Sequence, residues 1–354
     1  MNSNKILIVD DIEINRDILS EMLEEVYPVE TAEDGLQAVN IMSERADEFG
    51  AILLDLVMPN MDGLEVLKIM NERGWIETIP VLIISGEQSV ETERECFNLG
   101  VSDFIRKPFD TTLVHKRVGN IVELYLYKKS LEKKVDEQTV KLKRTNERII
   151  DILGGVVESR SLESGQHIQR VKGYTRILAQ EMMKSFKEYE LTPERINLIV
   201  SASALHDVGK VAIPDSILLK PGRFTPEEFD VMKTHTTRGC ELLEGIKDAW
   251  DEDYTKISWD ICRYHHERYD GRGYPDHLEG DDIPISAQLV SIADVYDALI
   301  SKRCYKDAYE LNEAYEMILN GECGTFSPKL IECFKKSKEK FEKLALNKKL
   351  MDND

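Results

Sequence analysis

The stretch Ala51-Ile52-Leu53-Leu54-Asp55 is a short apolar run that ends in a carboxylate. Residues 6–9, 81–84 and 103–105 form similar runs, and a weaker one lies near Val29. Short runs rich in Ile, Val and Leu that end in polar or turn residues are typical of strands buried on both faces of a parallel sheet. Amphipathic stretches separate the runs. The alternation predicts an α/β doubly wound, five-stranded parallel domain over residues 1–125.

One of these amphipathic stretches gives a more specific expectation. Ile14, Ile18 and Met22 recur at intervals of four residues, which places them on one apolar face of a helix.

Polar side chains follow four of the predicted strands. Asp10 and Asp11 follow the first, Asp55 the third, Ser85 the fourth and Lys107 the fifth. Because the functional crevice of such a sheet lies at the carboxyl ends of its strands, these side chains should meet at one edge. Carboxylates gathered there would repel one another without a hard cation such as Mg²⁺, which prefers oxygen ligands. Aspartate is also common at strand ends because it favours turns. Turn preference would explain one such aspartate, but it does not explain matching polar residues at the ends of four strands.

These positions resemble the receiver domain of bacterial two-component response regulators over roughly residues 4–125. The matching text is VDD at 9–11, LDLVMPNMDG at 54–63, IS at 84–85 and KPF at 107–109. The resemblance implies that Asp55 accepts a phosphoryl group from a sensor histidine kinase. The resemblance also implies that Asp10, Asp11 and the Val57 carbonyl bind Mg²⁺. Ser85 and Lys107 would contact the phosphate, and Phe104 would be the aromatic switch residue. A dianion added at the sheet edge would bias a bistable loop and helix.

Residues 121–156 change character. Their seam positions alternate spacings of three and four residues, as in a heptad repeat. The seam consists of Ile121, Leu124, Lys128, Leu131, Val135, Gln138, Leu142, Thr145, Ile149, Ile152 and Val156. A solvated helical connector is one interpretation, and nucleic-acid binding by this basic stretch is a more distant one. We favour a parallel coiled coil that makes a homodimer, since the seam runs for about five heptads and three or four usually suffice.

Residues 150–345 are predicted to be all-α, with helices at 162–187, 193–206, 225–244, 257–266, 286–301 and 312–319. Six of the seven histidines of the chain fall in this part, and five of them have carboxylates nearby: His167, His206, His235, His265 and His266. His206-Asp207 and Asp294 are expected in apolar helices, where a charge is costly unless it is paired or bound to metal. Glu163 precedes His167 by one helical turn. A mixed histidine and carboxylate set suits Fe or Mn, and a multi-metal site of this kind is typical of phosphoester hydrolysis.

The same stretches resemble the HD-GYP subgroup of metal-dependent phosphohydrolases over about residues 150–335. HDVGK at 206–210 resembles the HD signature, and HHERYDGRGYP at 265–275 resembles the second, defining signature. The resemblance implies hydrolysis of cyclic di-GMP to a linear dinucleotide or on to GMP. It also implies two or three Fe or Mn ions held by Glu163, His167, His206, Asp207, His235, His265, His266 and Asp294.

Further roles follow from the resemblance. Lys210, Arg303 and Lys306 would hold the substrate phosphates, Tyr274 would shape the nucleotide pocket, and His206, Asp207 and Lys210 would carry the catalytic step. Two alternatives stay open. The domain could be a catalytically weak cyclic dinucleotide sensor that signals through protein partners, or it could hydrolyse a hybrid cyclic GMP-AMP.

Composition limits the partners. The 354 residues carry 46 basic and 66 acidic side chains, a net charge of −20. Such a polyanion is a poor binder of duplex DNA, whose affinity comes from cations that meet phosphates. Six cysteines show no C-x-x-C spacing, no secretory leader precedes the first strand, and no run of 18 uncharged apolar residues occurs. We therefore expect a cytoplasmic protein without membrane insertion, divided into a receiver domain (1–125), a linker (121–156) and an HD-GYP domain (150–345).

Overall fold

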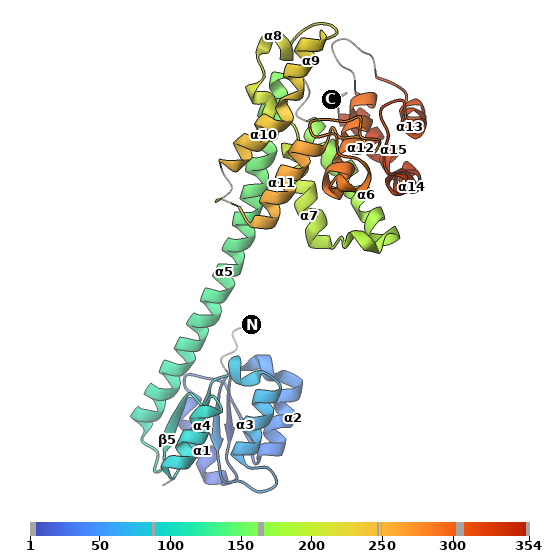
Figure 1. Ribbon diagram of the computed structural model, residues 1–354. Helices are drawn as coiled ribbons and strands as arrows, with labels where there is room; N and C mark the ends of the chain where they lie inside the picture. Colours follow the sequence, from blue (N-terminus) through green and yellow to red (C-terminus); the bar gives the residue numbers. More distant parts are fainter. Residues whose placement is uncertain are drawn as a thin grey trace. The chain divides into compact units, whose positions relative to one another are not determined.

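The computed structural model describes residues 5–86, 89–161, 166–245, 248, 250–301 and 308–351. The chain divides into two compact units, Met1–Val140 and Lys141–Asp354. The helix α5, Thr111–Arg160, is continuous across the division (Figure 1). None of the helices in the described ranges is both long enough and apolar enough to cross a lipid bilayer.

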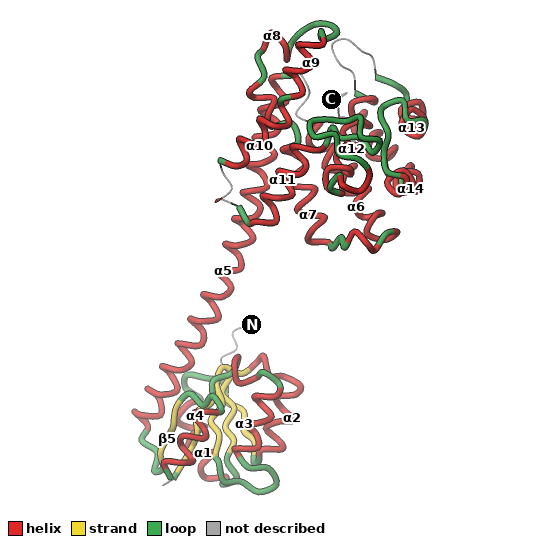
Figure 2. The backbone as a smooth tube through the Cα atoms, in the orientation of Figure 1, coloured by secondary structure: helices red, strands yellow, loops and turns green. Residues whose placement is uncertain are grey.

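The first unit contains a five-stranded parallel sheet with the strand order β2-β1-β3-β4-β5. Figure 2 shows the strands in yellow between the helices. Every residue of the central strand β3 is buried, as expected for a strand covered on both faces. The α/β doubly wound prediction is confirmed. The strands are β1 Lys5–Val9, β2 Val29–Ala32, β3 Phe49–Asp55, β4 Val81–Ser85 and β5 Asp103–Arg106. The helices are α1 Glu13–Leu23, α2 Gly35–Arg45, α3 Gly63–Glu72, α4 Val90–Asn98 and the first part of α5.

The helix predicted from Ile14, Ile18 and Met22 is present as α1, but the two isoleucines do not form its buried side. Leu19 and Leu23 are fully buried, whereas the exposed fraction of Ile14 is 68% and that of Ile18 is 38%. Both candidate faces repeat every four residues, and periodicity alone cannot rank them. The helix packs through its leucines and leaves the isoleucine face toward solvent.

The second unit is helical, as predicted. Its helices are the end of α5, α6 Gln166–Ser185, α7 Pro193–Ala202, α8 Asp215–Leu218, α9 Pro226–Lys233, α10 His235–Glu244, α11 Glu252–Tyr264, α12 Ile285–Ile300, α13 Leu311–Leu319, α14 Pro328–Lys336 and α15 Lys338–Met351. The single helix predicted over 225–244 is wrong, because Thr234 separates α9 from α10. His206 and Asp207 do not lie inside a helix either. They follow the short 3₁₀ turn Ser203–Leu205, and Asp207 has φ −103° and ψ 10°.

Aromatic rings fix α6 and α12 against each other in the second unit. Tyr174 on α6 meets Tyr296 on α12 edge to face, with ring centroids 5.2 Å apart. Phe341 stacks on Tyr174 at 4.6 Å. Each buried aromatic contributes about 1.5–3 kcal/mol. The two helices that carry His167 and Asp294 therefore have a rigid common base.

Candidate functional site

Three carboxylates and one ammonium group meet at the carboxyl edge of the sheet. Oxygens of Asp10, Asp11 and Asp55 all lie within 4.8 Å of one another. Lys107 Nζ donates to Asp10 Oδ2 at 3.0 Å and to Asp55 Oδ2 at 2.5 Å. Burial raises the pKa of Asp55, and the Lys107 ammonium opposes that shift. One ammonium neutralises only part of this cluster, so the donor set fits a divalent cation such as Mg²⁺.

The remaining receiver residues lie on or beside the strands. Ser85 is the last residue of β4 and is buried, and β4 pairs with β3 through Asp55 and Ile84. The Val57 N–H donates to Asp55 Oδ1 at 3.2 Å. Phe104 is buried in β5 with its ring 5.1 Å from that of Phe97.

A second acidic and imidazole cluster lies in the helical unit. Ligand atoms of Asp207, His235, His265 and His266 lie within 4.8 Å of one another. His235 Nε2 is 3.2 Å and His265 Nε2 is 3.9 Å from Asp207 Oδ1. His235 is the first residue of α10, and His265 directly follows α11. His235 and His265 therefore lie at helix ends that meet beside Asp207.

His206, His235 and His265 are each oriented by a hydrogen bond of Nδ1. Nδ1 of His206 lies 2.8 Å from the Ser203 carbonyl oxygen, and Nδ1 of His235 lies 2.8 Å from that of Met232. His265 Nδ1 lies 3.0 Å from the Ile261 carbonyl oxygen. A backbone carbonyl only accepts, so Nδ1 carries the proton and the Nε2 lone pair points to the cluster, as in metal-binding histidines.

The Nε2 atoms of these histidines make no hydrogen bond to the described residues. Nε2 of His206, His235 and His265 is buried without a hydrogen-bond partner in this part of the chain, and so is Asp207 Oδ1. Burial and the neighbouring His206 lower the pKa of His265 to about 3, so that this imidazole is neutral near pH 7. Buried acceptors without donors are costly unless a cation binds them. The donor set therefore fits divalent transition-metal ions.

His167 and Asp294 extend the cluster. His167 Nε2 lies 3.5 Å from Asp294 Oδ1, which is 3.9 Å from His206 Nε2. On the opposite side of the ring, His167 Nδ1 lies 2.6 Å from Asp297 Oδ2. Asp297 also accepts two hydrogen bonds from the Arg170 guanidinium, at 2.5 and 2.8 Å. This buried ion pair orients the imidazole in the way described for carboxylates behind metal-bound histidines.

Glu158 also belongs to this group, although the sequence motifs did not predict it. Its exposed fraction is 1%, and its Oε1 lies 3.3 Å from His167 Nε2. Burial raises its pKa to about 7, and His167 opposes the shift. A signal did exist, because Ile150, Gly154 and Glu158 share a helix face and Ile150 is buried. Glu163, the carboxylate expected beside His167, lies outside the described residues.

The residues expected to contact substrate are described in part. Lys210 Nζ lies 2.6 Å from Asp207 Oδ2, and its side chain is 15% exposed. The ring of Tyr274 stacks on His266 at 4.8 Å. Gly209 permits this arrangement, because a Cβ there would overlap the carbonyl oxygen of His235. Arg303 and Lys306 lie outside the described residues.

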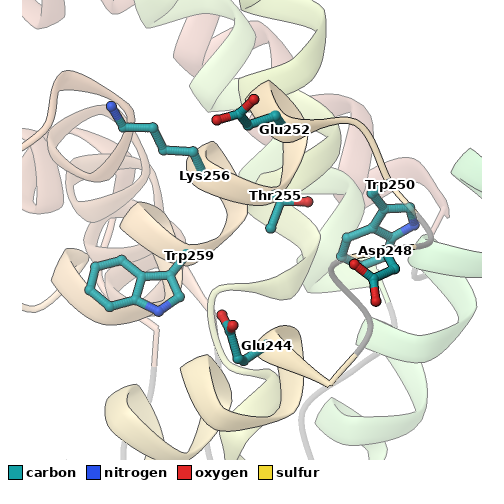
Figure 3. Close-up of a pocket in the computed structure, with 7 residues that line it drawn as sticks. All are labelled: Glu244, Asp248, Trp250, Glu252, Thr255, Lys256 and Trp259. Atoms are coloured by element: carbon teal, nitrogen blue, oxygen red, sulfur yellow. The ribbon is translucent and has the colours of Figure 1, made fainter.

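A separate pocket of about 510 Å³ opens at α10 and α11 (Figure 3). Trp250, Trp259 and Lys256 line it, together with Thr255 and three acidic residues. None of its lining residues belongs to the two clusters. The pocket is therefore no part of the candidate metal centre.

Two protein families match parts of this chain. Residues 6–119 match the response regulator receiver domain family, and residues 157–329 match the HD domain family. A probable cyclic di-GMP phosphodiesterase of Vibrio cholerae is 36% identical, over 96% of this chain and 79% of its own length. The cyclic di-GMP phosphodiesterase response regulator RpfG of Xanthomonas campestris is 30% identical, over 96% of this chain and 89% of its own. The 3'3'-cGAMP-specific phosphodiesterase 2 of Vibrio cholerae is 40% identical, over 60% of this chain and 38% of its own.

Proposed function

Because this chain belongs to the response regulators that join a receiver domain to an HD domain, we propose that it is a metal-dependent cyclic di-GMP phosphodiesterase under the control of Asp55 phosphorylation. The observation that carries the proposal is the convergence of unpartnered, buried Nε2 atoms and carboxylate oxygens in the described part of the helical unit. A binding module would need no such set. The substrate is a nucleotide messenger, and we place the protein in the cytoplasm.

The side chains of the helical unit have two proposed roles, metal binding and phosphate binding. His206, Asp207, His235, His265, His266, His167 and Asp294 would hold the cations, with Glu163 as a further ligand. Bound Fe or Mn ions, two or three in number, would supply Lewis-acid polarisation of a phosphoryl oxygen and a nucleophile at neutral pH. Lys210, whose Nζ lies 2.6 Å from Asp207 Oδ2, would stabilise the charge that develops on the phosphate oxygens. Arg303 and Lys306 would add further positive charge for the phosphates.

Tyr274 gives the site its aromatic surface. Its ring is held by the stack with His266. A base stacked on an aromatic side chain gains about 1–3 kcal/mol. Tyr274 would therefore position a purine base of the substrate, while the acidic remainder of the protein repels the substrate elsewhere.

The receiver site has its own proposed roles. Asp55 would accept the phosphoryl group from a sensor histidine kinase, with Mg²⁺ held by Asp10, Asp11 and the Val57 carbonyl. Lys107 would neutralise charge on the transferred group, and its present bonds to Asp10 and Asp55 support that role. Ser85 would contact the phosphate, and Phe104 would be the switch residue.

The seam of α5 supports a homodimer. Seven of its apolar residues are exposed in the single chain, by 49% to 68% of their surface: Leu124, Leu131, Val135, Leu142, Ile149, Ile152 and Val156. A helix that leaves a regular apolar stripe in water is typical of a coiled coil without its partner. Replacement of Leu131 and Leu142 by Asp should convert the dimer to a monomer in analytical ultracentrifugation.

The function is tested by hydrolysis of cyclic di-GMP with protein reconstituted anaerobically with Mn²⁺ or Fe²⁺. His206→Ala and Asp207→Ala should abolish turnover while the circular dichroism spectrum is retained. His115→Ala on α5, outside both clusters, is the control and should leave turnover unchanged. Full activity in the first two variants, or binding of the nucleotide without turnover by wild type, would refute the proposal, and the latter would favour a sensor.

A second substrate has support of its own. The relative specific for 3'3'-cGAMP shares 40% identity with this chain over 212 residues. The same assay with the hybrid nucleotide decides between them. A higher kcat/KM for 3'3'-cGAMP than for cyclic di-GMP would reassign the substrate and leave the metal centre unchanged.

A further inference from the structure

Glu158 has an environment that no protein group among the described residues satisfies. It stands in the last turn of α5 with an exposed fraction of 1%. Neither Oε1 nor Oε2 has a hydrogen-bond partner in the described part of the chain. Taking a carboxylate out of water costs several kcal/mol unless hydrogen bonds or a cation offset it. The described residues therefore leave both carboxylate oxygens available to a cation.

Other unpartnered ligand atoms face the same point. Ligand atoms of Glu158, His167 and His206 all lie within 4.8 Å of one another. Nε2 of both histidines is buried and has no hydrogen-bond partner among the described residues. Two ligands of one ion, each at about 2.0–2.2 Å, lie roughly 3–4 Å apart, so small side-chain adjustments would close the group on a cation.

Asp294 links this group to the neighbouring one. Its Oδ1 lies 3.5 Å from His167 Nε2 and 3.9 Å from His206 Nε2. The second group, Asp207 with His235, His265 and His266, is complete without Glu158. The unit thus offers two adjacent ligand sets, with His206 and Asp294 between them.

We propose that Glu158 is a direct ligand of a divalent cation that His167, His206 and Asp294 also hold, beside the cation at Asp207. This inference rests on the proposed metal centre and assigns a ligand that the sequence motifs do not contain. Two imidazoles and two carboxylates are the ligands that Fe²⁺ and Mn²⁺ accept readily.

The packing of α5 fixes the carboxylate in place. Gly154, one turn before Glu158, touches the turn that precedes His206, and an added Cβ would lie 2.5 Å from the Ala204 carbonyl oxygen. Two residues after Glu158, the Arg160 guanidinium donates to the Val211 carbonyl oxygen at 2.7 Å and to Asp215 at 2.6 Å. The end of the helix is therefore attached on both sides of Glu158 to the segment that carries His206 and Lys210.

The test compares three glutamine variants of the full-length chain: Glu158→Gln, Glu163→Gln and, as a control, Glu147→Gln on the exposed surface of α5. Metal-free protein is titrated with Mn²⁺, and bound ions per chain are counted by isothermal calorimetry and elemental analysis. Electron paramagnetic resonance of the loaded protein reports whether the Mn²⁺ ions are close enough to couple. We expect Glu158→Gln to bind one ion fewer, or that ion at least tenfold more weakly, and to lose the coupled signal. Glu147→Gln should match wild type.

Several results would overturn the inference. One is wild-type stoichiometry and affinity within twofold in Glu158→Gln. Another is loss of the ion only in Glu163→Gln, which would leave Glu158 as a neutral acid that bonds to His167. Metal-free Glu158→Gln should melt at or above the wild-type temperature, because it removes a buried charge, whereas a merely structural role predicts a lower melting temperature. Should the glutamine variant misfold, Glu158→Asp keeps a carboxylate one methylene shorter and should bind the ion more weakly than wild type. Equal affinity there would contradict direct ligation.

Failure of the proposed function gives a different result. Wild-type protein that binds both ions but hydrolyses no cyclic dinucleotide would refute the phosphodiesterase. The ion count of Glu158→Gln would still decide the ligand.

Discussion

Asp297→Asn removes one charge from a pair that is almost wholly buried. The exposed fraction of the Asp297 side chain is 0% and that of Arg170 is 7%. Loss of one member of such a pair costs about 3–5 kcal/mol, because the remaining charge stays in a poorly solvated place. The amide keeps the shape of the carboxylate, so the cost is electrostatic rather than a packing defect.

The matched control is Asp151→Asn. Asp151 pairs with Lys172 at 2.5 Å, but the two side chains are 25% and 16% exposed. A pair nearer the surface is worth about 0–1 kcal/mol. Both variants remove one aspartate charge from the same unit. They differ in how deeply the ion pair is buried.

The assay is urea unfolding of metal-free protein, followed by circular dichroism and by tryptophan fluorescence. Two of the three tryptophans, Trp250 and Trp259, belong to the helical unit and report its unfolding. The midpoint for Asp297→Asn should fall well below that of Asp151→Asn. Mn²⁺ affinity should also fall by about 10–100-fold, because His167 loses the carboxylate that orients it. Equal midpoints for the two variants would refute the role given to the buried pair.

Three further outcomes are expected. Asp55→Asn should abolish phosphorylation by acetyl phosphate with Mg²⁺, measured as the mass of the intact protein; a phosphorylated variant would place the acceptor elsewhere. Gly209→Ala should lower both the melting temperature and the amount of bound Mn²⁺, because the added Cβ would overlap the His235 carbonyl oxygen. The control Gly155→Ala, whose added Cβ would meet nothing within 4 Å, should leave Mn²⁺ binding unchanged and stabilise α5 by roughly 0.5–1 kcal/mol. Similar melting temperatures for the two variants would contradict the close approach of Gly209 to His235. Removal of the cations by chelator should lower the melting temperature of the helical unit, and Mn²⁺ at 100 times its dissociation constant should restore about 2.7 kcal/mol, as measured by calorimetry; an unchanged transition would show that the cluster holds no ion.

The alternation of apolar runs was enough to predict the parallel sheet and the edge at which Asp10, Asp55 and Lys107 meet. It was not enough to choose the face of α1. Leu19 with Leu23 and Ile14 with Ile18 repeat with the same period, and only packing on the sheet ranks them. The pattern also ran through Thr234, because a break of one residue between α9 and α10 leaves helical periodicity almost unchanged.

Glu158 shows a different limit. The heptad pattern of α5 predicts a seam that ends at Val156, and it carries no information about the opposite face of the helix. That face becomes internal only when Gly154 meets the turn before His206, a contact between segments fifty residues apart. Motifs adjacent in sequence predicted most of the ligand set, whereas this ligand depends on tertiary packing.

The helix α5 ends at Arg160, and Glu158 lies in its last turn. For a side-chain oxygen about 6 Å from the axis, a rotation of roughly 20° is a sideways step of about 2 Å. Metal–ligand bonds tolerate about 0.2 Å. The angular setting of the last turn of α5 is therefore a quantity to which bound cations would respond.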